Sequence, residues 1–167
     1  FLLLANLVLA SFQKRMGQST GVKPGDEMVA AMNTAKELGI PAVMADRPIQ
    51  ITLRRAWACN SGTGKIKLIS ALLASAFSKE EISSEQIENL KKQSEMDSMM
   101  SELSEYMPEI KKVLIDERDE YLAGSIWHSD GNSIVAVLGA GHLAGVKKHL
   151  EKIAAGEEMP DLEKISS

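Results

Sequence analysis

The sequence predicts an α/β fold that is mostly helical, with a small parallel sheet covered by helices. The 167 residues are 44% hydrophobic and 25% charged, which is the composition of one globular domain with a substantial core. Long stretches carry apolar residues at helical spacing. Two short apolar runs, residues 40–46 and 133–139, lie between these stretches. Such runs, buried on both faces, are typical of parallel strands.

The N-terminal part is predicted to be helical up to the first strand. Residues 1–17 contain helix formers and end at a glycine. Their apolar run is too short to span a bilayer, and no basic segment precedes it as in a secretory signal. A loop then leads to Asp26, which is expected to cap a helix that ends at Gly39.

The remaining elements are predicted in the same way. A helix has Pro48 in its first turn, and residues 61–107 form a helical insertion with a helix from Lys65 to Phe77. Pro108 is expected to be the first residue of the next helix. The second strand and a last amphipathic helix follow. We expect one domain over residues 1–156 and a polar tail or linker over residues 157–167.

Charge and cysteine content exclude two classes of protein. The net charge is −4 and the basic residues are scattered, so no nucleic-acid partner is expected. The single cysteine, Cys59, excludes an internal disulfide.

The two predicted strands alone would make a poor sheet. Because the chain starts in mid-pattern at Phe1, we expect it to be a fragment that lacks N-terminal strands.

Polar residues follow the carboxyl ends of both predicted strands. The first strand ends at Asp46 and Arg47, and the second ends just before His142. Sites in open parallel sheets form outside the carboxyl ends of the strands. We therefore expect these residues to converge on one edge with Glu117 and Arg118, which belong to a flanking helix.

Each of these residues also has a simpler interpretation. Asp46 and Arg47 fit a surface ion pair. Glu117 lies in the run DERDE, which is typical of a solvated helix face. Asp26, beside Glu27, fits a helix cap. The residues alone leave these alternatives open.

His142 stands at a glycine-lined turn that begins a helix. The helix dipole there favours a neutral imidazole, which is the form that a metal binds. The same stretch, GAGHLAG, also has a G-x-G-x-x-x-G pattern. A dinucleotide-binding turn, however, normally opens a βαβ unit with an acidic residue at the end of the next strand. Only one helix and a tail follow Gly145, so a metal or polar catalytic site is the favoured interpretation.

Four stretches, in order, carry a resemblance to a known family: PGDEMVAAMNTAKELGI, ADRPIQITLRRAW, LIDERDEYLA and VLGAGHLAGV. Together they resemble the TraB family, also called the PrgY pheromone-shutdown family. That family is related to the Tiki metalloproteases and, more remotely, to erythromycin-esterase and ChaN-like proteins. Its members typically carry two G-x-x-H motifs with glutamate and arginine residues.

The resemblance implies a metal-dependent peptidase or hydrolase that acts on small signalling peptides. Gly139 and His142 match the second G-x-x-H motif, so His142 and Glu117 are the implied ligands of a divalent metal. The other matching polar positions are implied catalytic residues: Glu27, Asp46, Arg47, Glu117 and Arg118. The alternative is a non-catalytic binding module that sequesters a signalling peptide or has a regulatory role.

Further expectations follow from where the sequence departs from the family. The first G-x-x-H motif is missing, so we expect the isolated chain to bind divalent metal weakly and to be inactive. Relatives in archaea and bacteria often carry C-terminal membrane helices, which implies a membrane-anchored parent with this chain as a soluble domain. An exposed apolar edge would also favour a homo-oligomer.

Overall fold

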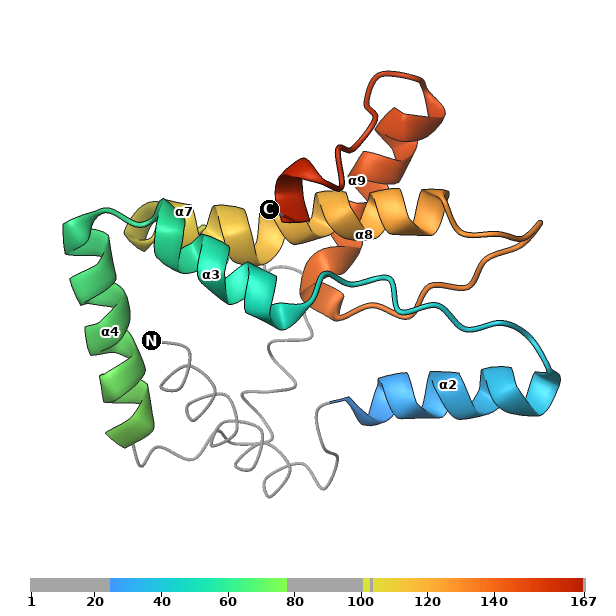
Figure 1. Ribbon diagram of the computed structural model, residues 1–167, viewed down its shortest axis with the longest axis horizontal. Helices are drawn as coiled ribbons and strands as arrows, with labels where there is room; N and C mark the ends of the chain where they lie inside the picture. Colours follow the sequence, from blue (N-terminus) through green and yellow to red (C-terminus); the bar gives the residue numbers. More distant parts are fainter. Residues whose placement is uncertain (1–24, 78–100, 103, 167) are drawn as a thin grey trace.

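A computed structural model describes residues 25–77, 101–102 and 104–166 of the chain, and what it describes is an assembly of helices (Figure 1). The helices, in chain order, are α2 (Asp26–Leu38), α3 (Ile49–Cys59), α4 (Gly62–Phe77), α7 (Pro108–Lys111), the π-helix η1 (Lys112–Asp116), α8 (Glu117–Trp127), α9 (Ala140–Ala154) and the 3₁₀-helix η2 (Lys164–Ser166). The predicted helix over residues 1–17 lies outside the described residues, as does most of the polar end of the insertion.

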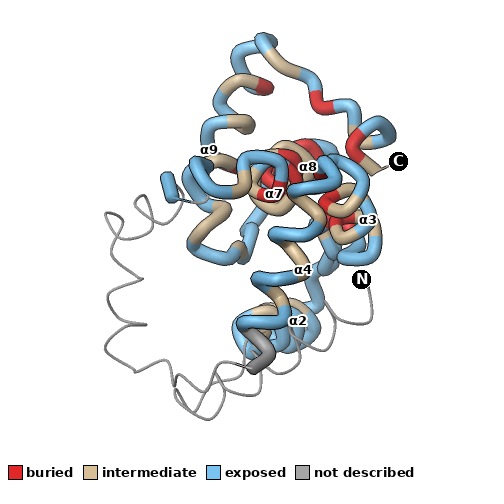
Figure 2. Tube along the Cα trace, turned by 90° about the vertical axis from the view of Figure 1, so that its left-hand side faces the viewer, coloured by how far each residue is buried: buried red, intermediate tan, exposed pale blue. Residues whose placement is uncertain are grey.

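The centre of the structure is α8, which packs most extensively against α9. Their shared core consists of Leu122, Ala123, Val146 and Ile153. A second apolar cluster joins α3 to α7 and η1 through Ala56, Ile110 and Val113. Buried positions accordingly follow the α7–η1–α8 rod and the elements beside it (Figure 2). The rod connects both clusters and carries the residues between them.

The predicted small parallel sheet is wrong for the described residues, which contain helices and no strand. Residues 40–45 and 134–139 are indeed irregular, connecting segments rather than helices. Ala45 and Leu138 pack against the α8–α9 core, whereas Val43, Met44 and Val135 are exposed. An apolar run favours extended backbone, but a strand also needs a neighbour to complete its hydrogen bonds. The described residues supply no such ladder.

Several local signals predicted the helix boundaries correctly. Gly39 follows α2 with a φ of 66°, the left-handed conformation that glycine tolerates best. Pro108 is the first residue of α7, as predicted, whereas Pro48, expected in the first turn of its helix, holds the cap position just before α3. The predicted cap at Asp26 differs from the structure: Gly25 holds the cap position and Asp26 is the first helical residue.

The C-terminal segment, predicted as a polar tail or linker, lies against α8. Pro160 and Ile165 are buried. A β-carbon added at Gly124 would lie 2.8 Å from Leu162 and 3.2 Å from Pro160, so this glycine permits the close approach. In the part of the chain that the structure describes, no helix is both long enough and apolar enough to cross a membrane.

Gly145 provides a test of the α8–α9 contact. A β-carbon there would overlap the Asp119 carboxylate, so Gly145→Ala must displace this side chain from its place between α8 and α9. We expect this substitution to lower the free energy of unfolding by about 1–3 kcal/mol in chemical denaturation.

The matched control is Gly62→Ala, where nothing lies within 4 Å of the added β-carbon. Because alanine suits a helix better than glycine, this variant should be neutral or gain up to about 1 kcal/mol. Equal stability of the two variants would contradict a glycine-dependent contact between α8 and α9.

Candidate functional site

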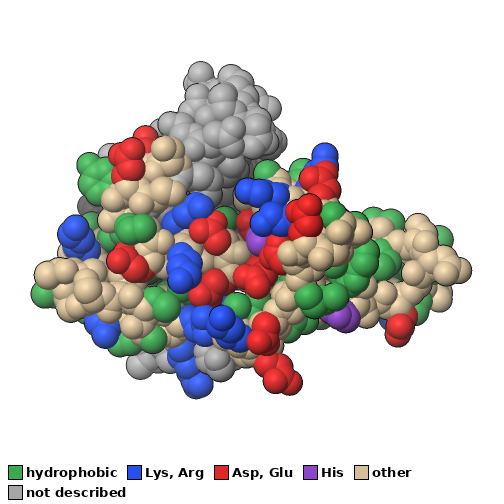
Figure 3. All heavy atoms as spheres, turned by 90° about the horizontal axis from the view of Figure 1, so that it is seen from above, with side chains coloured by type: hydrophobic (Ala, Val, Ile, Leu, Met, Phe, Trp, Pro, Cys, Tyr) green, Lys and Arg blue, Asp and Glu red, His purple; other side chains and the backbone are tan. Residues whose placement is uncertain are grey.

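Three consecutive charged residues in the first turn of α8 reach three different neighbours. Successive residues of a helix are rotated by about 100°, so Glu117, Arg118 and Asp119 point in different directions. They contact, in that order, the arginines of the α3 region, Asp46, and His142 of α9. On the face of the molecule seen in Figure 3, exposed acidic and basic side chains are interleaved.

The Arg47 side chain is completely buried and joins four segments of the chain. Its Nε donates to the Thr52 hydroxyl at 3.0 Å, and its Nη2 donates to the Val113 carbonyl at 3.0 Å. Its Nη1 donates to Glu117 at 3.0 Å and to the Ile165 carbonyl at 2.6 Å. A buried guanidinium needs this degree of pairing because its desolvation is costly.

Glu117 is held by two arginines. Arg55 forms a two-pronged pair with it, Nε to Oε2 at 2.8 Å and Nη2 to Oε1 at 3.0 Å, while Arg47 also binds Oε2. Burial by itself raises the pKa of the Glu117 carboxyl, but hydrogen bonds from Arg55 and Arg47 and their positive charges outweigh it and lower the pKa. The hydrogen bonds that Arg55 donates to Glu117 in turn raise the pKa of Arg55. Glu117 is therefore an ionised structural carboxylate.

The π-helix η1 supplies one of the acceptors that Arg47 uses. The backbone N–H of Glu117 binds the carbonyl of Lys112, five residues earlier, instead of that of Val113. The Val113 carbonyl thus loses its usual helical donor and accepts from Arg47. Single π-turns occur often at functional sites, and here the turn frees a backbone acceptor for a buried cation.

Asp46 and Arg118 form a more exposed pair beside this network. Arg118 binds both carboxylate oxygens of Asp46, at 3.2 and 2.5 Å. The two side chains are 44% and 23% exposed, so this pair stabilises the fold less than the Arg47 network does. Asp46 also accepts from the backbone N–H of Arg47 at 2.7 Å, which fixes the turn between the two residues.

His142 lies in the first turn of α9 and pairs with Asp119. Its Nδ1 is 2.6 Å from the Asp119 carboxylate, and the side chains are only 14% and 6% exposed. Gly139 caps α9, and its carbonyl accepts from the backbone N–H of His142. Gly145 has no side chain and so leaves room for the Asp119 carboxylate. Among the described residues, no hydrogen bond or ion pair is seen at the other imidazole nitrogen, Nε2.

The sequence-predicted site residues separate into two groups. Asp46, Arg47, Glu117 and Arg118 contact one another, and His142 joins the same turn of α8 through Asp119. Glu27 lies on α2, where it accepts from the backbone N–H of Gly25. No hydrogen bond or ion pair within the described ranges links Glu27 to the others.

The implied role of Glu117 as a metal ligand meets a physical obstacle. Both of its oxygens already accept from guanidinium groups, which would repel a cation. Within residues 25–77, 101–102 and 104–166, no group of three or more His, Cys, Asp or Glu side chains could hold a metal ion. His142 remains the one implied ligand with an available nitrogen in this part of the chain.

Sequence reasoning missed three members of the site: Thr52, Arg55 and Asp119. Asp119 lies in the run DERDE, a pattern typical of a solvated helix face. Its signal was the neighbouring apolar pattern, because Leu122 and Ala123 of the same helix are buried. Arg55 lies one turn after Thr52 on α3, so the two share a helix face.

The comparisons with known proteins agree on one family. The sequence profile of the TraB/PrgY/gumN family matches residues 2–157. An uncharacterised protein of Methanocaldococcus jannaschii is 36% identical over 161 residues, which is 95% of this chain and 40% of that protein. TraB domain-containing proteins of Bos taurus and Homo sapiens are 27% and 26% identical over 164 residues.

Each of these mammalian alignments covers 87% of this chain and 43% of the relative. The chain thus spans about two fifths of the length of the curated relatives that it matches. No solved structure matches the chain.

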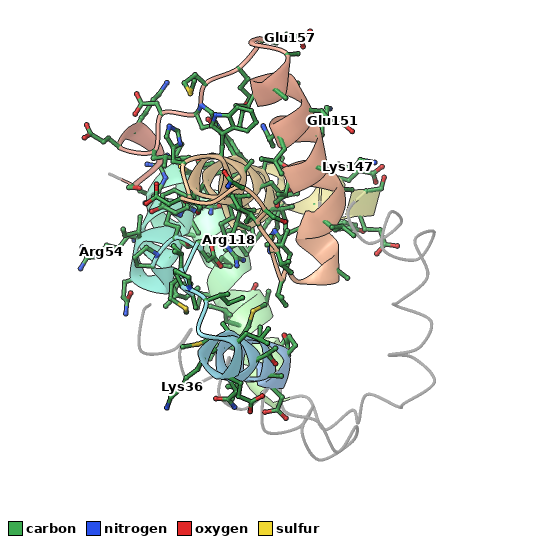
Figure 4. The ribbon with its side chains drawn as sticks, turned by 90° about the vertical axis from the view of Figure 1, so that its right-hand side faces the viewer. Lys36, Arg54, Arg118, Lys147, Glu151 and Glu157 are labelled. Carbon is green, nitrogen blue, oxygen red and sulfur yellow. The ribbon has the colours of Figure 1, made fainter. Side chains whose placement is uncertain are left out.

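The Arg47 network generates a stability prediction. Arg47→Met removes one of the two arginines that hold Glu117 and leaves the buried carbonyls of Val113 and Ile165 without this donor. We therefore expect a loss of about 3–5 kcal/mol in the free energy of unfolding. Arg54→Met is the matched control, since Arg54 lies on α3 but points away from the body of the structure (Figure 4). It should change stability by less than about 0.5 kcal/mol. A loss of similar size in both variants would count against the network.

A second prediction concerns acid. Because the folded-state pKa of Glu117 is lowered, its contribution to stability is present above the unfolded-state pKa near 4.5 and is lost as the pH falls through the folded value. Glu117→Gln should therefore be clearly less stable than the wild type at neutral pH, and the difference should shrink below about pH 4.5. Denaturation at a series of pH values measures this.

Glu37→Gln, on the exposed part of α2, is the control and should parallel the wild type throughout. A constant difference between Glu117→Gln and the wild type down to about pH 3 would show that Glu117 is not the titrating group.

Proposed function

Because the chain belongs to the TraB/PrgY/gumN family, we propose that it carries part of the active site of a hydrolase that acts on small peptides, with the His142–Asp119 pair as the chemical centre. One observation carries this assignment. The pair combines a nearly buried carboxylate, a short contact of 2.6 Å and an imidazole nitrogen with no contact seen in the described part of the chain.

The chemistry of the pair follows from its geometry. Asp119 accepts from Nδ1–H of His142, which fixes the tautomer and leaves the lone pair on Nε2. Nε2 can then accept a proton from the water that attacks the scissile carbonyl carbon and return it to the amine that leaves when the C–N bond breaks. Asp119 orients the ring and stabilises the imidazolium that forms, and Gly145 keeps the carboxylate in reach.

A divalent metal is a further element of the proposal for the full-length protein. A carboxylate behind a histidine is the usual support for a metal-ligating imidazole, and Nε2 of His142 has the right chemistry to bind one. A catalytic zinc site commonly uses three protein ligands. The described residues offer one, since Glu117 is held by arginines, so they do not make a complete metal site and no step depends on a metal.

The rival proposal is a peptide-binding module without catalysis. The saturated Arg47–Glu117–Arg55 network would suit a rigid binding scaffold as well as an enzyme. The two proposals differ at His142. A binding module needs only the shape and the hydrogen bonds of the His142 side chain, whereas a hydrolase needs His142 to transfer a proton.

The experiment uses the natural full-length protein and a peptide library read by mass spectrometry, with and without added zinc or manganese. His142→Gln and Asp119→Asn should each lower the cleavage rate by about 10²- to 10⁴-fold, the contribution typical of acid–base catalysis. His128→Gln, at the far end of α8, should leave the rate unchanged. Intact peptides that remain bound to the wild type without cleavage would instead establish the binding module.

We further propose that the protein forms homo-oligomers. The support for assembly is the exposure of Val43, Met44 and Val135, which are 67%, 79% and 88% exposed on the two connecting segments. Exposed apolar segments favour association. Light scattering should give a mass above 18.1 kDa for the chain, and Val135→Lys should shift it toward the monomer. A monomeric wild type at high concentration would contradict the assembly.

A further inference from the structure

The segment from Glu157 to Ser166, here named the strap, returns from the end of α9 across α8 to the Arg47 network (Figures 1 and 4). Pro160 and Leu162 lie against the bare backbone at Gly124. Two hydrogen bonds from backbone N–H groups to Asp161 hold the last turn, η2. The Ile165 N–H donates to the Asp161 carbonyl, and the Lys164 N–H donates to the Asp161 carboxylate. The strap is thus a folded element with a fixed path.

The end of the strap supplies backbone acceptors to both arginines that hold Glu117. The Ile165 carbonyl accepts from Arg47 at 2.6 Å, and the Lys164 carbonyl accepts from Arg55 at 3.3 Å. Ile165 is 6% exposed. If the strap left, two cations would lose acceptors next to the first turn of α8. That turn carries Asp119 two residues after Glu117.

The start of the strap is held to α9 by a second ion cluster. His149 Nδ1 lies 2.7 Å from one oxygen of Glu158, and Lys152 Nζ lies 3.4 Å from the other. That second oxygen is buried and accepts no hydrogen bond. The positive charge of the Lys152 ammonium group is what stabilises the negative charge there. Burial raises the pKa of Glu158, but the hydrogen bond and charge of His149 and the charge of Lys152 lower it overall.

We propose that the strap positions the His142–Asp119 pair and that Glu158, latched by His149, is the positioning residue that keeps the strap in place. The latch fixes the start of the strap on α9. The strap carbonyls hold Arg47 and Arg55 on Glu117, and this fixes the turn from which Asp119 reaches His142. The positioning of a reactive group rests on the proposed function; the latch and its mechanical effect do not.

The test is hydrogen exchange on the full chain carrying Glu158→Gln. The amides of Lys164 and Ile165 should exchange several-fold faster than in the wild type, because the latch no longer restrains the strap. The ¹⁵N chemical shifts of the His142 imidazole should move in the same variant. A merely local role of Glu158 would not move them.

The matched control is Glu151→Gln, on the outer face of α9, where the side chain is 67% exposed and pairs loosely with Lys147 (Figure 4). It should change neither the exchange nor the shifts. His149→Phe should reproduce the effect of Glu158→Gln, and the double variant should add little to either, since both remove one contact.

Three outcomes decide the matter. Faster strap exchange with shifted His142 signals supports the proposal. Unchanged exchange in both single variants overturns the latch, and faster exchange with unmoved His142 signals overturns the coupling. Failure of the proposed function has a different signature: the wild type would leave peptides uncleaved, or His142→Gln would cleave them as fast as the wild type, while the exchange and shift results stayed as expected.

Discussion

A single buried cation organises the described structure. The Arg47 side chain has no exposed surface, and each of its three nitrogens donates to an acceptor from a different part of the chain. A guanidinium removed from water must recover its lost hydration through hydrogen bonds. Arg47 does so only when α3, the η1–α8 rod and the C-terminal strap are all in place. Burial of Arg47 is therefore tolerated only when these elements pack around it and supply their acceptors together.

The π-helix is part of the same requirement. An uninterrupted α-helix would give the Val113 carbonyl to the N–H of Glu117, and Arg47 would have one acceptor fewer. The shifted bond to Lys112 frees that carbonyl and also sets the rotation of the residues that follow. Glu117 then faces the arginines while Asp119 faces α9. One irregular turn therefore determines both the structural network and the direction of the histidine pair.

The sequence predicted the helices better than it predicted the sheet, and the reason is the range of the interactions. Gly39, Pro48 and Pro108 mark helix boundaries through their own backbone conformations, which a single sequence shows directly. A strand depends on hydrogen bonds to a distant partner, which apolar residues at 40–46 and 133–139 cannot specify.

The same distinction between local and distant interactions applies to the site. The residue types at positions 46–47 and 117–118 were recognised, but their cross-pairing, Asp46 with Arg118 and Arg47 with Glu117, depends on how distant helices pack. Asp119 was missed because a charge in a polar run shows its burial only in three dimensions.

Saturation of hydrogen bonds separates the structural members of the site from the chemical ones. Glu117 receives three guanidinium hydrogen bonds, and their charges keep it ionised, so it has little freedom to take up or release a proton near neutral pH. His142 has one nitrogen fixed by Asp119 and the other without a contact seen in the described residues. Proton transfer requires a group that is held on one side and open on the other. A resemblance between sequences marks these polar positions alike, whereas the geometry assigns stability to the arginine–glutamate network, and the proposed function assigns proton transfer to His142.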